Sequence, residues 1–226
     1  MPLLGNAAML LSFDVAPEAM QEHDDWHTHE HLPERLAIPG FLRGSRWVAA
    51  QGGPRYMVLY EVQDLDTLVS PAYLQRLNQP TPWTSRMMPS YRGMTRGLCT
   101  VVASLGHGLG RHGLLTRFDA EAGARPTLMR WITEVVMPPL PTQPGLGSAH
   151  LLEAGMAAPM TNEQRIRGAD GGVGAALLVT GYSLAGIEAL AAGPLSPASL
   201  QTRGATAVTS VVYQVDYTLT AQELAV

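Results

Sequence analysis

Apolar and polar positions divide the chain into short segments of two periodicities. Alternating or β-branched apolar runs predict strands, and apolar residues three and four apart predict helices. The N-terminal half shows a strand, a helix, two strands, a helix and a strand over residues 7–14, 17–38, 41–50, 56–62, 65–77 and 98–103. This βαββαβ order is typical of the ferredoxin-like unit.

The C-terminal half repeats this order. Its predicted elements cover residues 114–119, 125–138, 147–153, 174–181, 184–192 and 206–217. An offset of 105 residues places Leu10, Phe13, Asp14, Trp26, Pro33, Pro39 and Gly40 over Leu115, Phe118, Asp119, Trp131, Pro138, Pro144 and Gly145. So many matches at one offset indicate an internal duplication.

Two such units together predict the fold class. A ferredoxin-like sheet carries helices on one face, and its other apolar face must be covered. We therefore expect an α+β protein whose tandem ferredoxin-like repeats, a site-bearing 1–105 and a structural 112–226, face each other as an intrachain pseudo-dimeric α/β barrel. The Gly-rich stretch 155–171 is interpreted as a loop, and residues 78–94 as an insertion specific to the first repeat.

The composition limits the possible chemistry. All 15 basic residues among the 226 are arginines, which excludes a P-loop lysine and a pyridoxal Schiff base. A net charge of −4 argues against nucleic-acid binding, and the single Cys99 excludes an internal disulfide and a Cys-rich zinc site. The apolar runs are too short to cross a membrane. The N-terminal apolar run is not preceded by the basic residue that a signal peptide would have. We expect a cytoplasmic protein without a membrane partner.

One face of the first predicted helix is the main candidate site. Four of the seven histidines fall within nine positions of this helix, and helical spacing places His27 and His31 on one face with His23 beside them. The 105-residue offset aligns His23, His27 and His31 with Leu128, Ile132 and Val136. The first repeat therefore has imidazoles where the second has aliphatic core residues.

Three interpretations of this face remain open. The histidines can be core residues bonded to the backbone or to Glu34. They can line a pocket in which His31, His27 and Glu34 transfer protons, because an imidazole pKa of about 6.5 suits that role. The same three residues also form a 2-His-1-carboxylate pattern for non-haem metal, although Pro33 disturbs the helix before Glu34. We expect the pocket, with neither a metal nor another cofactor.

Other polar residues are candidates for substrate binding. They are Arg46, His23, Tyr60 and Trp83. Arg46 aligns with Leu151 and either holds a carboxylate or enolate, or pairs with Glu61 or Glu34. Tyr60 can supply a phenol, and Trp83 lies in the insertion, which can form a lid.

A segment of the first repeat resembles a known family. The pattern is Trp26-x-x-x-Glu30-His31-Leu32-Pro33-Glu34-Arg35-x-x-x-Pro39-Gly40-Phe41, followed by a strand with Arg46. It is similar to the first helix and second strand of EthD-like and stress-responsive proteins of the dimeric α/β-barrel superfamily. The resemblance implies a pocket for a small hydrophobic molecule and cofactor-independent cyclase, isomerase or oxygenase chemistry, with His31 as the marked residue.

Two functions are consistent with these features. The first is an enzyme that uses histidine acid/base chemistry on a hydrophobic organic substrate. The second is a non-catalytic ligand-binding or assembly module with structural histidines. In both cases we expect a monomer, or a homodimer formed through a surface other than the barrel interface.

Overall fold

Eight antiparallel strands close into one barrel in the computed structural model, which describes residues 3–156 and 160–225. The strands are β1 (Ala7–Val15), β2 (Phe41–Ala49), β3 (Tyr56–Val62), β4 (Tyr91–Gly106), β5 (His112–Ala120), β6 (Leu146–Met156), β7 (Ala175–Gly181) and β8 (Ala205–Thr220). Around the barrel they follow the order β1-β3-β2-β8-β5-β7-β6-β4. The predicted α+β class is confirmed.

Each half of the chain supplies four neighbouring strands. The first half, residues 7–106, has the strand order β4-β1-β3-β2, and the second half, residues 112–220, has the order β8-β5-β7-β6. The halves join where β2 pairs with β8 and β4 pairs with β6. Edge strands with free backbone groups thus find partners, and the two predicted facing sheets become one continuous closed sheet.

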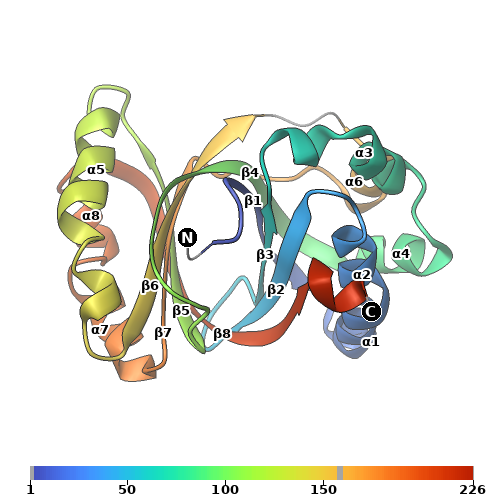
Figure 1. Cartoon of the computed structure of the whole chain (residues 1–226), viewed down its shortest axis with the longest axis horizontal. Helices are drawn as coiled ribbons and strands as arrows, with labels where there is room; N and C mark the ends of the chain where they lie inside the picture. Colours follow the sequence, from blue (N-terminus) through green and yellow to red (C-terminus); the bar gives the residue numbers. More distant parts are fainter. Residues whose placement is uncertain (1–2, 157–159, 226) are drawn as a thin grey trace.

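Helices cover the barrel on two opposite sides, as Figure 1 shows. One side carries α1 (Met20–Trp26), α2 (Leu32–Leu36), α3 (Pro71–Asn78), α4 (Pro82–Met87) and α6 (Asn162–Arg167), and the other carries α5 (Arg125–Trp131), α7 (Leu184–Ala192) and α8 (Pro197–Gln201). Short 3-10 turns are η1 (Pro17–Ala19), η3 (Asp66–Val69), η4 (Met88–Ser90), η6 (Leu140–Thr142) and η7 (Ala221–Leu224). The exceptional helix is α6, which follows β6 of the second half yet lies beside α3 of the first (Figure 1).

The first helical segment of each half contains a π-helical turn. These turns are η2 (His27–His31) and η5 (Ile132–Val136), which lie 105 residues apart. Their wide hydrogen bonds run from the N–H of Leu32 to the carbonyl of His27 and from the N–H of Met137 to the carbonyl of Ile132. A proline follows each turn, Pro33 or Pro138. Proline has no N–H and crowds the preceding turn, and a wider turn accommodates it.

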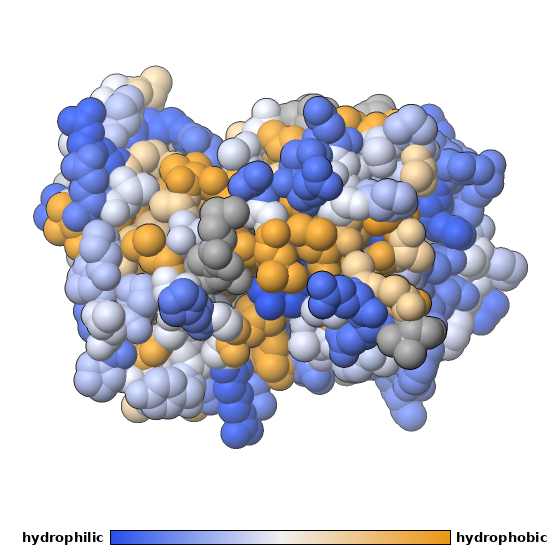
Figure 2. All heavy atoms as spheres, viewed as in Figure 1, coloured by the Kyte–Doolittle hydropathy of each residue, from blue (hydrophilic) through white to orange (hydrophobic). Residues whose placement is uncertain are grey.

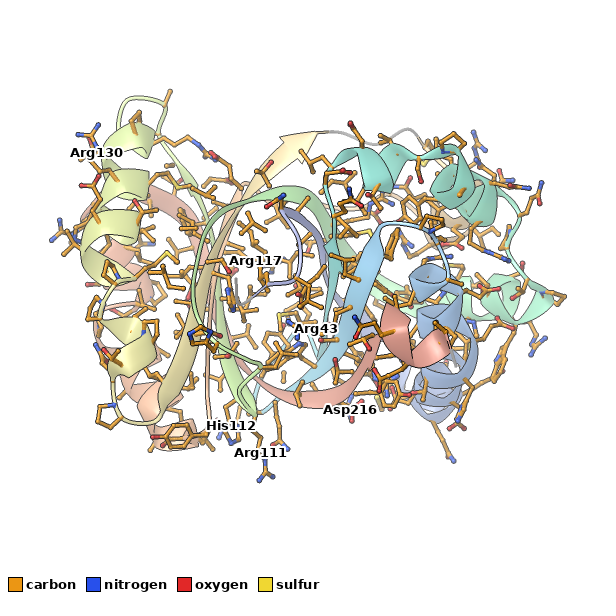
Figure 3. The ribbon with its side chains drawn as sticks, in the orientation of Figure 1. Arg43, Arg111, His112, Arg117, Arg130 and Asp216 are labelled. Carbon is orange, nitrogen blue, oxygen red and sulfur yellow. The ribbon has the colours of Figure 1, made fainter. Side chains whose placement is uncertain are left out.

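Strand alternation creates buried surfaces both inside and outside the barrel. On β3, Val58 and Tyr60 face the helices, whereas Leu59 packs inside the barrel, as the alternation in the sequence predicts. Figure 3 shows Arg43 and Arg117 pointing into the barrel. Arg43 pairs there with Glu61, which is fully buried. Side chains therefore fill the barrel, and it is not an open channel.

Several predicted boundaries differ from the structure. The strands β4 and β8 are both longer than expected, at 16 residues each. The helices α6 and α8 lie in stretches where no helix was predicted. In the view of Figure 2, apolar side chains gather over the barrel end, and hydrophilic ones lie over the helices on either side. Among the described residues, no helix combines the length and apolar character that a membrane span requires.

Candidate active site

A narrow cavity lies between the first-half sheet and its covering helices. Its apolar wall is formed by Met9, Leu11, Phe13, Val58, Leu77, Met88 and Met94. Its polar wall is formed by His27, His31, Arg35, Tyr60, Tyr73, Tyr91, Arg96, Glu163 and Arg167. About 30 Å³ is open to the centres of water molecules, which is room for one or two waters. An organic ligand therefore needs the walls to move apart.

His27 has a neighbour at each ring nitrogen. Its Nδ1 lies 3.4 Å from Nη1 of Arg46, and its Nε2 lies 3.5 Å from the phenol oxygen of Tyr60. A guanidinium group only donates hydrogen bonds, so Nδ1 accepts and the proton resides on Nε2. The Tyr60 oxygen then accepts from Nε2, and the Tyr60 hydroxyl proton is available to the cavity that Tyr60 lines.

Arg46 orients His27 from outside the cavity lining. Its Nε donates to Oδ2 of Asp216 at 2.7 Å, and its Nη1 donates to Oγ1 of Thr28 at 3.1 Å. Figure 3 shows Asp216 on β8, beside the α1–α2 helices. The two partners considered from the sequence are not used, because Glu61 binds Arg43 and Glu34 binds Arg76. Arg46 is thus a buried ion-paired residue and does not reach the cavity.

His23 lies behind the cavity and is fully buried. Its Nδ1 lies 3.1 Å from Oδ1 of Asp24, and its Nε2 lies 3.4 Å from the hydroxyl of Tyr91. The carboxylate can only accept, so the proton of the neutral ring is on Nδ1 and Tyr91 donates to Nε2. His23 therefore holds the cavity-lining Tyr91 and does not line the cavity itself.

His31 has the least satisfied imidazole of the three. Among the described residues, no hydrogen-bond partner is found for its buried Nδ1. The ring lies 4.3 Å from that of Trp26 and 5.5 Å from that of His27, measured between centroids. A buried polar atom without a partner is costly in a native protein and often marks a functional group.

Burial lowers the pKa of all three histidines. For His27 and His31 the pKa falls well below the ordinary value, because burial is the largest cause and nearby arginine cations add to it. For His23 the pKa also falls, although hydrogen bonding to Asp24 opposes the effect of burial. The three rings are therefore neutral at pH 7.

Burial also raises the pKa of the cavity phenols. The pKa values of Tyr60 and Tyr91 both lie above the ordinary value for this reason. Both hydroxyls therefore stay protonated and can donate hydrogen bonds.

Arg35 is a site residue that the sequence analysis missed. It is 1% exposed, and its Nη2 donates to both carboxylate oxygens of Glu163, at 2.6 and 2.8 Å. Burial alone would lower the pKa of Arg35, but the charge and hydrogen bonds of Glu163, together with the neighbouring tyrosines, raise it above its ordinary value. Glu163 comes from α6 of the second half, so the cavity is built by both halves.

The π turn explains why Arg35, and not Glu34, lines the cavity. A π turn contains more residues than an α turn, so the inward face moves on by about one position. The inward series is then His27, His31 and Arg35, each four residues apart. Glu34 instead pairs with Arg76 at 3.1 Å, between α2 and α3. The structure does not bring Glu34 together with the histidines.

The alternative metal arrangement of His27, His31 and Glu34 is not assembled in the structure. Glu34 is directed to Arg76, and Pro33 lies in the disturbed segment, as the sequence indicated. Within residues 3–156 and 160–225, no group of three or more His, Cys, Asp or Glu side chains could hold a metal ion. We derive no chemical step through a metal.

Trp83 lies outside the cavity. Its indole Nε1 donates to Oε1 of Glu22 at 3.0 Å, so α4 is attached to α1. The rest of this insertion does reach the cavity, because Met88, Tyr91 and Met94 line it, and α6 adds Glu163 and Arg167. A Thr161-x-x-Gln164 capping-box pattern marks the start of α6, and Oε1 of Gln164 accepts from the N–H of Thr161 at 3.2 Å. That pattern could have identified the helix from the sequence.

Comparison with known proteins identifies shared folds. No protein-family model and no curated protein matches the sequence. An anthrone oxidase-like protein has a similar structure, with a TM-score of 0.70 and 12% identity over 98% of this chain and 96% of that chain. A putative monooxygenase from Fusobacterium nucleatum gives a TM-score of 0.62 and 7% identity over 96% of both chains. A putative chlorite dismutase gives 0.56 and 9% identity over 97% of this chain and 96% of that one. This chain therefore shares its α+β barrel fold with proteins of these kinds.

Proposed function

We propose that the protein is an enzyme that transfers protons to and from a small hydrophobic organic substrate without an organic cofactor. The observation that carries the proposal is the neutral His27–His31 pair, together with Tyr60, on the polar wall of a cavity whose other wall is apolar. A cavity that combines apolar surface with convergent polar groups is typical of ligand sites. The names of two fold neighbours, anthrone oxidase-like and putative monooxygenase, favour the oxygenase type among the possible reactions.

The proposed roles follow from the hydrogen bonds. His31 accepts a proton from an acidic C–H of the substrate, because its Nδ1 has no protein partner among the described residues. Tyr60 donates its hydroxyl proton as a hydrogen bond to the oxygen of the resulting enolate. Arg46 and Asp216 act as positioning residues, since they fix the tautomer of His27 that supports Tyr60.

We further propose that the two halves are repeats of one ferredoxin-like unit, residues 1–105 and 112–226. The shared strand order and the π turns 105 residues apart support this interpretation. Gly40 and Gly145, also 105 residues apart, both have positive φ, 92° and 88°, directly before the second strand of their half. We still expect the partner to be a small hydrophobic ligand. We also expect the barrel to be complete within one chain.

Anthrone is a suitable first probe, because its methylene protons are acidic. Exchange of these protons with D₂O, followed by NMR under nitrogen, tests proton transfer alone. In air, oxygen uptake tests the complete reaction, in which anthrone and one O₂ give anthraquinone and one water. We expect the wild-type protein to accelerate exchange at least tenfold over buffer, and the His31→Val variant to lose this acceleration. Rates no higher than buffer for anthrone and related enolisable ketones would instead support the binding module with structural histidines.

A further inference from the structure

The polar end of the cavity carries more positive than negative charge. Arg35 pairs with Glu163, and Arg167 forms a two-pronged pair with Asp170. Arg96 also lines the cavity, and its nearest described carboxylate is the already engaged Asp170, at 3.9 Å. Three guanidinium groups thus share two carboxylates. With the histidines neutral, one positive charge at this end is left without its own counter-ion.

A hydrogen-bond donor at this end also lacks a partner. Arg35 is 1% exposed, and no acceptor among the described residues binds its buried Nη1. Leaving a buried charged donor unbound is unfavourable, so such an atom beside a cavity points to a ligand acceptor. Arg35 lines the same cavity as His31 and Tyr60, the proposed proton-transfer residues.

We infer that the substrate carries an acidic group, a carboxylate or an ionised enol or phenol, which binds at Arg35 Nη1 and Arg96. This inference rests on the proposed function and names the class of substrate for the same cavity. An anion there supplies the missing acceptor and balances the excess charge. The apolar remainder of the ligand then lies against the wall that contains Met9, Leu77 and Met94.

The route by which a ligand enters the cavity can be inferred from which half of the chain supplies each lining residue. Among the described lining residues, only Glu163 and Arg167 belong to the second half, and both lie on α6. Besides the Arg35 pair, α6 contacts the first half through two hydrogen bonds from Asn162 to Asn78, at 3.1 and 2.7 Å, and through Arg167, which lies against Met88 and the Tyr91 ring. Displacement of α6 therefore enlarges the cavity without breaking any strand pair of the barrel.

The test uses two probes of the same shape, 2-naphthoate and 2-naphthamide, in isothermal titration at pH 7.5. The acid is charged and the amide is neutral. We expect the acid to bind at least tenfold more tightly than the amide. Arg96→Gln should abolish most of this preference, because it removes the guanidinium that has no counter-ion of its own. The fold should be retained, because Asp170 keeps Arg167 as its partner.

Two variants complete the design. A double variant, Arg35→Gln with Glu163→Gln, removes the first guanidinium without leaving a buried charge, and it should also reduce the preference. The control is Arg76→Gln, which removes an arginine that pairs with Glu34 outside this cavity and should leave the preference unchanged.

The outcomes separate this inference from the proposed function. Equal binding of acid and amide, binding of neither probe, or an acid preference that survives both cavity variants overturns the inference. Proton exchange from anthrone that depends on His31 would still support the proposed function in each case. Conversely, an acid preference lost in Arg96→Gln supports the inference even if the His31→Val variant exchanges protons as fast as the wild type.

Discussion

The first helical segments of the two halves share a backbone but not a chemistry. Both contain a π turn before a proline and end at a glycine with positive φ. In the first half this frame presents His27 and His31 to the sheet, and in the second half Ile132 is buried in an apolar cluster at the equivalent place. The π turn therefore accompanies the proline, and only the side chains on it differ between the halves. The fold itself does not require the imidazoles.

We expect the largest effect on stability from breaking the buried ion pair between Arg35 and Glu163, which distinguishes the first half from the second. Arg35→Leu leaves a buried carboxylate unpaired, and we expect the free energy of unfolding to fall by about 3–5 kcal/mol in urea denaturation. Adding Glu163→Leu should recover most of this loss. The control is Arg125→Leu in the second half, where the pair with Glu153 is about one-third exposed and is worth about 0–1 kcal/mol. Similar losses in the two halves would contradict the special role of the buried pair.

The next prediction exchanges the side chains at one equivalent position. Ile132→His places an imidazole in an apolar cluster and should lower the free energy of unfolding by about 3 kcal/mol, from lost apolar burial and an unpaired polar ring. His27→Ile should change it by less than about 1 kcal/mol, because Arg46 keeps Asp216 and Thr28 as partners. Equal losses of unfolding free energy in the two variants would show that each half needs its own side chain at this position for stability.

A smaller effect concerns pH. The pKa values of His27 and His31 are lower in the folded than in the unfolded chain, so below about pH 6.5 the unfolded chain binds more protons. Stability is then lost as the pH falls, by about 1.4 kcal/mol per pH unit for each such histidine between its two pKa values. Urea denaturation at pH 7.5, 6.0 and 5.0 should show a weaker pH dependence for the His27→Ile/His31→Val double variant.

Two remaining histidines set the background of that measurement. Burial lowers the pKa of His23, and it lowers the pKa of His150, inside the barrel, to about 4. Both residues are present in the wild type and in the variant, so the difference between the two proteins reports His27 and His31. Identical pH profiles would contradict the buried neutral state of His27 and His31.

The smallest expected effect on stability is that of His31→Val. Its Nδ1 has no partner to lose among the described residues, and Val136 is the residue at the equivalent position. We expect thermal unfolding to show unchanged stability or a gain of about 1 kcal/mol. A clear loss of stability would instead assign His31 a structural role.

Local patterns predicted the fold better than they predicted the site. Strands such as β3 follow from short, nearly continuous apolar runs, because both faces of the barrel wall are buried. The first seven residues of β4 were missed, since residues 91–97 contain two glycines and two arginines, which favour a loop interpretation. Comparison of the halves singled out His27 and His31, and both residues line the cavity.

The rest of the site depended on geometry that the residue types do not specify. An ideal α-helix of 3.6 residues per turn placed Glu34 inward, and the π turn placed Arg35 there instead. Glu163 lies 128 residues from Arg35 along the chain, so no local pattern relates them. The first difference comes from the local π turn before Pro33, and the second comes from a tertiary contact between distant segments.

The position of α6 has a consequence for how such a site can evolve. In a symmetric dimer of identical chains, every insertion appears twice, and each site must accept it. In a single chain, the connection between β6 and β7 carries α6, while the connection between β2 and β3 spans only residues 50–55. One half can thus contribute a segment to the other half, and no equivalent segment has to be present in the other direction. Under the proposed duplication, covalent linkage allowed the second half to contribute α6 to the candidate site of the first.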